Sequence, residues 1–286
     1  MSNRSSPLPS ITVFGLGIIG SRAADHISAA GYPTKTWSRS PRDREDFVSD
    51  PVAAARESDI LAVYLKDVPA VCDIFSRIEG VLGPGKTLVN HATVDYETTN
   101  FLVARCAELG CDFLNAPFTG SKVAAGNAAL VYYAGGHTDV LEQVRPFLEV
   151  TSTQIMEVDS PAAATILKLT TNLITASTVQ ALAEGLRINL AHGIPAATYL
   201  ESIKPNACAS VLASMKVVSM AEGDFEPHFS LSNMLKDSRY MLDLAERAGL
   251  HTPGIENTAA QMQKRAEEGE GEFDFSILFK QFEPAQ

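Results

Sequence analysis

Short apolar runs alternate with amphipathic stretches through the first half of the chain. Runs of this length, bounded by glycine, proline and polar residues, are typical of buried strands, and the stretches between them have the 3.6-residue period of helices. We expect strands at residues 11–14, 34–38, 60–65, 87–91, 111–115, 130–134 and 154–157, with helices at 21–30, 68–78 and 97–109. This alternation predicts an α/β fold with a doubly wound sheet.

The pattern changes near Ser160. From Pro161 to about His192 the chain is rich in Ala and Leu, and apolar residues cover much of its circumference, which predicts one long buried helix. Further helices are expected at residues 196–204, 207–221, 230–248 and 256–268, with Gly249 where a helix commonly ends. We therefore predict two domains, an α/β domain at residues 1–160 and, at residues 161–286, an interdomain helix followed by an all-α domain.

A glycine-rich turn follows the first expected strand: Gly15-Leu16-Gly17-Ile18-Ile19-Gly20. In this spacing Gly15 permits a tight turn, Gly17 lets the backbone approach a pyrophosphate, and Gly20 lets the next helix pack close to the strand. The amides at the start of that helix can then face the phosphate anion. Glycines also close ordinary turns, but the strand before the motif and the helix and strand after it favour a Rossmann domain that binds a dinucleotide.

The residues after the second expected strand bear on the choice of dinucleotide. A site selective for NAD usually has Asp or Glu about 20 residues after the glycine motif, to bind the ribose 2′-hydroxyl. This chain has Ser38, Arg39 and Ser40 there, and its first acid is Asp43. A guanidinium makes paired hydrogen bonds to a phosphate, and serine hydroxyls add donors. A solvated basic turn is the alternative, but within a Rossmann domain we predict NADP(H) as the cofactor.

Composition narrows the classes of function. The chain has 286 residues, of which 45% are hydrophobic, and a formal net charge of −11. This charge argues against a general binder of nucleic acids or anionic membranes. The four cysteines lack metal-ligand or disulfide-framework spacing, residues 1–10 lack the apolar core of a signal peptide, and no apolar run is long enough to span a membrane. We expect a cytoplasmic protein with reduced thiols, no metal site, and no nucleic-acid or membrane partner.

Three later segments carry candidate chemistry. Asn115–Lys122 follows an expected strand end, where ligands of open α/β sheets bind, and its Thr119 hydroxyl and Gly120 amide could bind a carboxylate. A plain connecting loop explains that segment equally well. Lys236-Asp237 begins a later helical face, where exposed charges are the ordinary interpretation.

The third segment lies on the long helix, where Lys168 and Asn172 are separated by one turn and share a face. Lys168 has apolar neighbours, which remove water from its ammonium group. A cation in such a place can polarise a carbonyl and donate a proton as hydride arrives. The alternative is a lysine whose stem is buried and whose charged head reaches water.

The four motifs together resemble those of the β-hydroxyacid dehydrogenases, which include 3-hydroxyisobutyrate dehydrogenases and glyoxylate/succinic semialdehyde reductases. The matching segments are residues 15–20, 115–120, 168–172 and 236–237, and the resemblance extends from Ile11 to Phe279. It is nearest to the glyoxylate/succinic semialdehyde branch, through residues 120–122 and 225–229. The resemblance implies an NADPH-dependent oxidoreductase that reduces a small carboxylate-bearing aldehyde or keto acid to the hydroxy acid, and a homodimer or homotetramer.

The resemblance also implies roles for single residues. Lys168 would be the general acid, Asn172 would position the substrate, and Thr119 with the Gly120 amide would bind its carboxylate. Leu65 and Lys66 match the loop over the cofactor phosphates, Thr93 matches a position beside the nicotinamide, Lys236 matches a residue that reaches the cofactor, and Phe229 and Asp237 match residues that close the pocket.

The chain departs from the family pattern at several positions. The family usually has an acid at Asn115, Val at Phe118 and Ser at Thr119, and a glycine-rich turn at residues 159–164, where this chain reads Asp-Ser-Pro-Ala-Ala-Ala. We expect a narrower or reshaped pocket beside Thr119. Two alternatives remain open: an imine reductase, although those enzymes generally replace the lysine at Lys168, and a non-enzymatic homologue that binds the cofactor.

Overall fold

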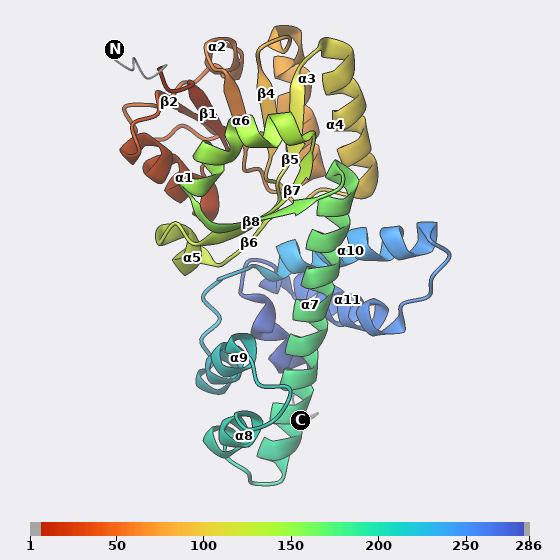
Figure 1. The fold of residues 1–286 in the computed structure, drawn as a ribbon. Helices are drawn as coiled ribbons and strands as arrows, with labels where there is room; N and C mark the ends of the chain where they lie inside the picture. Colours follow the sequence, from red (N-terminus) through yellow and green to blue (C-terminus); the bar gives the residue numbers. More distant parts are fainter. Residues whose placement is uncertain (1–6, 283–286) are drawn as a thin grey trace. The chain divides into compact units, whose positions relative to one another are not determined.

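The computed structural model describes residues 7–282 of the chain. The chain divides into two compact units, and the border between Lys168 and Leu169 falls inside the long helix α7 (Pro161–Ala191) (Figure 1). None of the helices in the described part combines the length and apolarity needed to cross a bilayer. The domain limits 1–160 and 161–286 stay a prediction.

The first unit contains a mixed sheet in the order β2-β1-β3-β4-β5-β7-β6, with β8 paired to β7. The strands are β1 (Ile11–Phe14), β2 (Thr34–Trp37), β3 (Ile60–Val63), β4 (Thr87–Asn90), β5 (Asp112–Asn115), β6 (Phe118–Thr119), β7 (Leu130–Gly136) and β8 (Ser152–Val158). Strands β1 to β5 pair in parallel, whereas β7 runs antiparallel to β5 and β6. The predicted doubly wound sheet is confirmed, and its antiparallel part was not predicted.

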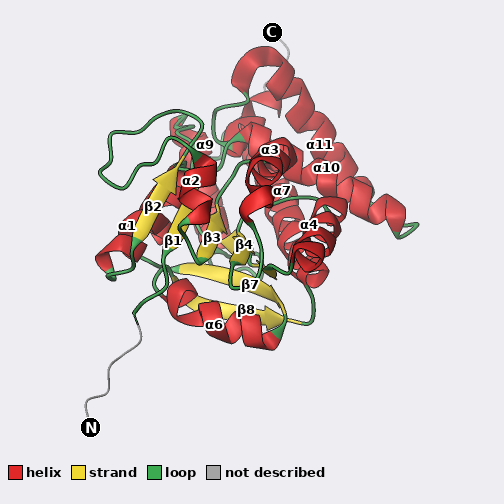
Figure 2. Cartoon of the chain, turned by 90° about the horizontal axis from the view of Figure 1, so that it is seen from above, coloured by secondary structure: helices red, strands yellow, loops and turns green. Residues whose placement is uncertain are grey.

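Helices cover both faces of this sheet (Figure 2). They are α1 (Ile18–Ala29), α2 (Pro51–Arg56), α3 (Val68–Ile78), the 3₁₀ turn η1 (Glu79–Val81), α4 (Tyr96–Leu109), α5 (Lys122–Gly126) and α6 (Thr138–Glu149). Alternate strand residues face opposite layers: Val13 packs with α1 and α6, and Phe14 packs with α2, α3 and α4. Asp50, Asp67 and Asp95 accept hydrogen bonds from the first free amides of α2, α3 and α4, which fixes where each helix begins.

The second unit is helical over its described residues. After α7 come α8 (Ala196–Ile203), α9 (Val211–Glu222), α10 (Leu231–Arg247), α11 (Pro253–Arg265), a π-helical turn η2 (Ala266–Glu270) and a 3₁₀ segment η3 (Phe275–Phe282). One apolar cluster joins α7 to α10, α11 and η3, and a second joins the later part of α7 to α8 and α9. Strand-like pairing in this part is limited to one isolated bridge, Ser230–Asp274. The predicted all-α part is confirmed.

Three predicted helix starts are wrong: α1 and α11 each begin three residues earlier than expected, at Ile18 and Pro253, and α9 begins four residues later. We expected a helix from residue 207, but α9 begins at Val211 because the Ser210 side chain accepts a hydrogen bond from the Ala213 amide, at 3.0 Å. A serine in this position ends the preceding turn and starts the helix. By contrast, α7 spans nearly the whole segment predicted for it.

Candidate active site

The glycine turn between β1 and α1 has the shape that phosphate binding needs. Gly15 has a φ of +105°, and a Cβ there would collide with the Tyr64 carbonyl oxygen. A Cβ on Gly20 would collide with the Gly15 carbonyl oxygen, whereas nothing lies within 4 Å of one on Gly17. The turn is therefore tight at Gly15, closely packed at Gly20, and open at Gly17, immediately before α1 begins at Ile18. Residues in this arrangement fit a bound pyrophosphate.

The other predicted cofactor residues of the first unit lie at the same edge of the sheet, whereas Lys236 lies on α10 in the second unit. Strands β2, β1, β3 and β4 are parallel neighbours, so the segments after them emerge together at their carboxyl ends. These segments carry Ser38, Arg39 and Ser40 after β2, Leu65 and Lys66 after β3, and Thr93 after β4. The Leu65 Cδ2 atom is 3.1 Å from the place where a Gly15 Cβ would stand, so Leu65 lies against the glycine turn. In the turn itself Leu16 is buried, Ile19 is half-buried and Ile18 is exposed.

The turn after β2 exposes two guanidinium groups. The Ser38 hydroxyl donates to the Ser40 carbonyl at 2.6 Å and closes the turn. Arg39 and Arg42 are exposed, and Ser40 between them is also exposed. These two arginines are therefore accessible to an anionic ligand at this edge.

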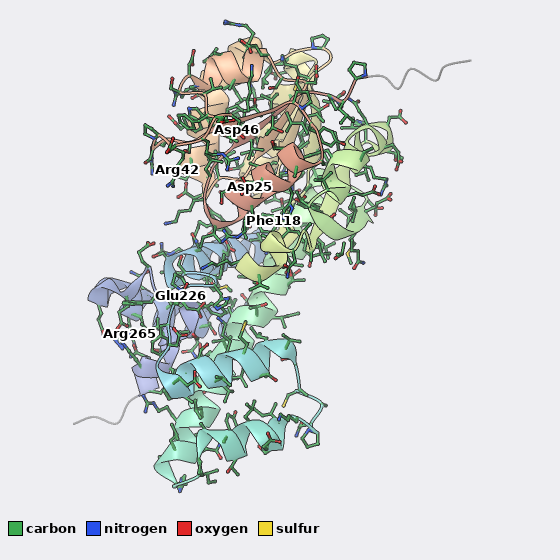
Figure 3. The ribbon with its side chains drawn as sticks, turned by 90° about the vertical axis from the view of Figure 1, so that its left-hand side faces the viewer. Asp25, Arg42, Asp46, Phe118, Glu226 and Arg265 are labelled. Atoms are coloured by element: carbon green, nitrogen blue, oxygen red, sulfur yellow. The ribbon has the colours of Figure 1, made fainter. Side chains whose placement is uncertain are left out.

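Two other basic residues of this region are held by carboxylates. Arg44 donates from Nη1 to Asp25 at 2.7 Å, and from Nε and Nη2 to the two oxygens of Asp46 at 2.9 and 3.0 Å. The hydrogen bonds from Asp46 and Asp25 raise the pKa of Arg44 above its usual value. Lys35 pairs with Glu57. Figure 3 labels Asp25, Asp46 and the neighbouring Arg42. Of the four basic side chains in this region, only Arg39 and Arg42 are exposed.

Trp37 ends β2, one residue before this turn, and it is the only tryptophan of the chain. Its indole N–H donates to the Ser49 carbonyl at 3.2 Å, and the Arg77 guanidinium lies 5.3 Å from the ring centroid. The ring is 5% exposed. The side chain thus anchors the strand end from which the Arg39 turn departs.

The predicted carboxylate-binding residues lie at the β6–α5 turn. Thr119 is exposed, and Gly120 has a φ of +142°, where a Cβ would lie 2.8 Å from Leu130 Cδ2. The Phe118 ring packs near Tyr64 and Tyr132, with centroid distances of 6.1 and 6.4 Å. Successive strand residues face opposite sides. The half-buried Phe118 ring therefore packs against the apolar cluster of the first unit, and a narrower or reshaped pocket beside Thr119 stays a prediction.

A buried histidine lies next to this edge, and sequence reasoning did not select it. His91 follows β4, stacks on Tyr64 with a centroid distance of 4.2 Å, and its Nδ1 lies 2.8 Å from the Ala116 carbonyl oxygen. Burial lowers the pKa of His91 to about 3, so the ring is neutral and Nδ1 is the donor. The Tyr64 hydroxyl bonds that of Tyr132 at 2.7 Å, and burial raises the pKa of both tyrosines. A single histidine after an apolar run gives no sequence signal of this packing.

Lys168 and Asn172 occupy consecutive turns of α7 and are 9% and 8% exposed. The Asn172 amide donates to Asp237 Oδ2 at 2.7 Å, and Lys236 Nζ donates to Asp237 Oδ1 at 2.7 Å. Asp237 is fully buried. The second unit therefore brings together three of the predicted residues, Asn172, Lys236 and Asp237.

Phe229 stands on the segment between α9 and α10, which is held by Asp274. Asp274 Oδ2 accepts the amides of His228 and Phe229 at 3.1 and 3.2 Å, and the Phe229 ring packs edge-on against Phe275. The Lys216 ammonium bonds the other oxygen of Asp274. Sequence reasoning missed Lys216 and Asp274, since each is a lone charge in the sequence.

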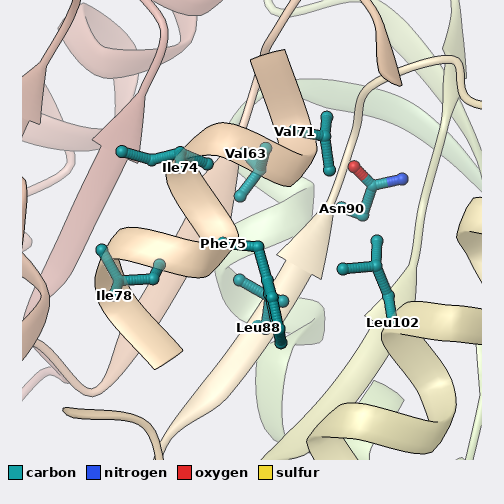
Figure 4. Close-up of a pocket in the computed structure, with 8 residues that line it drawn as sticks. All are labelled: Val63, Val71, Ile74, Phe75, Ile78, Leu88, Asn90 and Leu102. Carbon is teal, nitrogen blue, oxygen red and sulfur yellow. The ribbon is translucent and has the colours of Figure 1, made fainter. Parts of the chain in front are cut away.

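Two further features do not contribute to the candidate site. A small cavity between α3, α4 and the sheet is lined mostly by hydrocarbon, which gives a phosphate no anchor (Figure 4). Its lining residues are Val63, Val71, Ile74, Phe75, Ile78, Leu88, Asn90 and Leu102. Within residues 7–282 no cluster of His, Cys, Asp and Glu side chains could hold a metal ion.

Comparison with known proteins decides the family. Residues 10–159 match the model of the NAD binding domain of 6-phosphogluconate dehydrogenase, and residues 162–282 match the model described as NAD-binding of NADP-dependent 3-hydroxyisobutyrate dehydrogenase. The chain belongs to the β-hydroxyacid dehydrogenase family. As a member it is an NAD(P)-dependent oxidoreductase of the 3-hydroxyisobutyrate dehydrogenase-like type, which acts on hydroxyl groups.

Individual relatives agree with this assignment. The chain is 29% identical over 282 residues to the uncharacterized oxidoreductase YfjR of Bacillus subtilis, covering 94% of this chain and 98% of that protein. It is 26% identical to glyoxylate/succinic semialdehyde reductase 2 of Arabidopsis thaliana, covering 97% and 80%. The solved 3-hydroxyisobutyrate dehydrogenase of Mycobacterium tuberculosis with L-serine has a TM-score of 0.89 at 21% identity, covering 97% and 100%. The similarity to the Mycobacterium tuberculosis structure shows that this β-hydroxyacid dehydrogenase family member has the same fold.

Proposed function

We propose that this protein is an NADPH-dependent reductase of small aldehydes or keto acids that carry a carboxylate. The observation that carries the cofactor choice is the turn after β2. Arg39 and Arg42 are exposed there, while Lys35 and Arg44 are held by carboxylates. An exposed guanidinium suits a 2′-phosphate, and the turn has no acid placed to bind a ribose 2′-hydroxyl before Asp43.

The residues of the first unit fit a dinucleotide. Its pyrophosphate would lie at the open Gly17 and the first amides of α1, with Leu65, Lys66 and Thr93 along the same sheet edge. When bound, NADPH supplies the hydride for the reduction. Ser38, Arg39 and Ser40, in the turn after β2, would bind the 2′-phosphate.

Lys168 is the proposed proton donor. Its ammonium belongs to a buried side chain on α7, and a charge shielded from water polarises a carbonyl oxygen more strongly than an exposed one. Donation of its proton to that oxygen completes the alcohol. Thr119 and the Gly120 amide are proposed to bind the substrate carboxylate, and Asn172, fixed by Asp237, is proposed to orient the substrate.

The substrate class follows from this donor set together with the named activity of the Arabidopsis relative. We propose glyoxylate and succinic semialdehyde as the first substrates to test. The roles of Phe229, Asp237 and Lys236 around the substrate and cofactor belong to the same proposal.

The test is a spectrophotometric assay of the purified chain with NADPH or NADH, each with glyoxylate, succinic semialdehyde or a cyclic imine. The proposal expects oxidation of NADPH with at least one aldehyde and a clear preference for NADPH over NADH. Turnover of the imine alone would favour an imine reductase. Tight NADPH binding in calorimetry without turnover of any compound would favour a non-enzymatic homologue.

A further inference from the structure

A chain of amide hydrogen bonds runs from the sheet to the first turn of α7. Asn90 Nδ2 donates to Asn115 Oδ1 at 2.9 Å. Asn115 Nδ2 in turn donates to the Pro161 carbonyl oxygen at 2.8 Å and to Thr165 Oγ1 at 2.9 Å. Both asparagines are almost fully buried. The helix that carries Lys168 is therefore fastened at its start to the ends of β4 and β5.

Backbone groups at both ends fix the direction of these hydrogen bonds. The Pro161 carbonyl can only accept, so the Asn115 group that faces it must be the NH₂. Asn90 is fixed in the same way, since its Nδ2 donates to the Ala92 carbonyl at 3.1 Å and its Oδ1 accepts the Ala92 amide at 3.2 Å. A carboxylate at position 115 would present an acceptor to the Pro161 oxygen, with no proton between them.

Two more contacts hold the same turn. Thr99 donates its hydroxyl to the Asp95 carbonyl at 3.0 Å, so the Thr165 hydroxyl, 2.8 Å from Thr99 Oγ1, is the donor of that pair and accepts from Asn115. On β7, Gly135 approaches Ser160 so closely that a Cβ would collide with the Ser160 carbonyl oxygen. All of these contacts lie within the first unit.

We infer that Asn115 is a positioning residue for Lys168. Lys168 follows Thr165 by three residues, on the same side of α7, so a displaced first turn would move the ammonium. Asn115 stands where the family usually has an acid, and Ala162–Ala164 stand in place of its glycine-rich turn. The two departures are complementary. The alanines favour a helical first turn of α7, where glycines would not, and the Asn115 amide holds that turn in place. This inference rests on the proposed function of Lys168.

The test is Asn115→Asp, with Asn100→Asp as the matched control. Asn100 is exposed on α4, so the control adds the same charge without touching the amide chain. We expect the turnover number of Asn115→Asp to fall by about tenfold to 100-fold, the loss typical of a misplaced reacting group. The dissociation constant of NADPH should stay within about twofold of native, because the glycine turn and Arg39 are unchanged.

A pH profile separates positioning from general damage. A buried carboxyl titrates well above its usual pKa, and once protonated it can donate to the Pro161 oxygen. The turnover of Asn115→Asp, expressed as a fraction of native turnover at the same pH, should therefore rise as the pH falls from about 9 to about 5. The titratable groups nearby on the packed elements are His91 after β4, Asp95 at the start of α4, and Asp159 and Lys168 beside or on α7. Native and Asn100→Asp share these groups and give the baseline profile.

Hydrogen exchange keeps the inference separate from the proposed function. In Asn115→Asp the amides of the first two turns of α7 should exchange about tenfold faster than native, whatever the protein catalyses. If the native chain reduces no aldehyde but this exchange changes, the anchoring stands and the proposed function fails. Native exchange and native turnover at alkaline pH in Asn115→Asp would overturn the inference.

A second pair of variants covers the case in which Asn115→Asp does not fold. Thr165→Val removes the hydroxyl that accepts from Asn115, and Thr165→Ser keeps it. We expect Thr165→Val to lose turnover with NADPH affinity unchanged, and Thr165→Ser to stay within about twofold of native. Equal turnover of the two Thr165 variants would overturn the inference.

Discussion

The Lys216 ammonium lies 2.5 Å from a carboxylate oxygen of Asp274, and each side chain is only 2% exposed. Burial alone would raise the pKa of Asp274, but Lys216 and the Ser276 hydrogen bonds hold it below its usual value. The same carboxylate accepts the amides of His228 and Phe229. One buried ion pair therefore fixes the segment that carries Phe229.

Removing one member of this pair should strongly destabilise the protein. In Lys216→Met the Asp274 carboxylate stays buried without its cation, and we expect a loss of about 3–5 kcal/mol in the free energy of unfolding. Urea unfolding measures it. The control is Lys204→Met, which removes an exposed ion pair with Glu201 and should cost at most about 1 kcal/mol. Equal losses in the two variants would contradict the role assigned to the buried pair.

Lys168→Ala should reduce turnover with the best aldehyde by about 10²–10⁴-fold, because general acid catalysis contributes rate of this order. NADPH binding should remain, since the glycine turn and Arg39 are untouched. Lys168→Arg should restore little of the rate, because a guanidinium stays protonated and cannot act as a matched proton donor. Steady-state kinetics together with calorimetric NADPH titration test both variants. Near-native turnover of Lys168→Ala would remove the proposed mechanism.

Arg39→Ala should weaken NADPH binding by about 10–100-fold, which corresponds to the loss of charge-assisted hydrogen bonds worth about 1.5–3 kcal/mol. NADH binding should change little, since NADH has no 2′-phosphate. Arg44→Ala is the comparison: its guanidinium is held by Asp25 and Asp46, so we expect a smaller effect on NADPH affinity. Calorimetric titrations with both dinucleotides decide the point, and equal losses for NADPH and NADH in Arg39→Ala would refute the assignment.

Two glycines of the same turn should respond differently to alanine. Gly17 has a φ of −75° and open space around a Cβ, so Gly17→Ala should keep the thermal midpoint of unfolding. Its methyl group would occupy the place of the phosphate, and NADPH affinity should fall by at least about tenfold. Gly20→Ala forces a methyl group against the Gly15 carbonyl oxygen, and we expect a destabilisation of about 1–3 kcal/mol or more. Equal melting temperatures of Gly17→Ala and Gly20→Ala would contradict the contrast between open space at Gly17 and close packing at Gly20.

His91 should make the first unit sensitive to acid. The pKa of His91 is lowered from 6.5 to about 3 in the folded protein, so the unfolded chain binds this proton first. The free energy of unfolding should therefore fall as the pH drops from 6.5 towards 3, by roughly 1.4 kcal/mol per pH unit from this group.

His91→Phe keeps an aromatic ring beside Tyr64 and removes the titration, so its stability should depend less steeply on pH over this range. Urea unfolding at a series of pH values measures the slope. The same substitution at the exposed His192 controls for the loss of an imidazole. If His91→Phe and native lose stability equally with acid, His91 is not the group responsible.

Features carried by neighbouring residues could be predicted from the sequence. The glycine turn, the alternation of strands and helices in the first unit, and the span of α7 all follow from short motifs or from periodicity, and the structure has them where expected. The antiparallel course of β7 was not predicted, because an apolar run does not state its direction.

Features made by distant partners could not be predicted. Lys216 and Asp274 are 58 residues apart, and neither position has a local pattern that names the other. Asn115 was recognised as a departure from the family, but its partners Pro161 and Thr165 lie on another element. Phe118 was recognised as bulkier than the residue usual in the family, but its ring partners Tyr64 and Tyr132 lie far from it in the sequence or on another strand.

The position of Trp37 gives the protein an intrinsic optical reporter. It is the sole indole of the chain, it ends β2 directly before Ser38 and Arg39, and it is held between the Ser49 carbonyl and the Arg77 guanidinium. Its emission overlaps the absorption band of a reduced nicotinamide and not that of the oxidised form. Fluorescence of the unlabelled chain can therefore report whether a dinucleotide is bound at the sheet edge that carries Arg39, and whether its nicotinamide is reduced or oxidised.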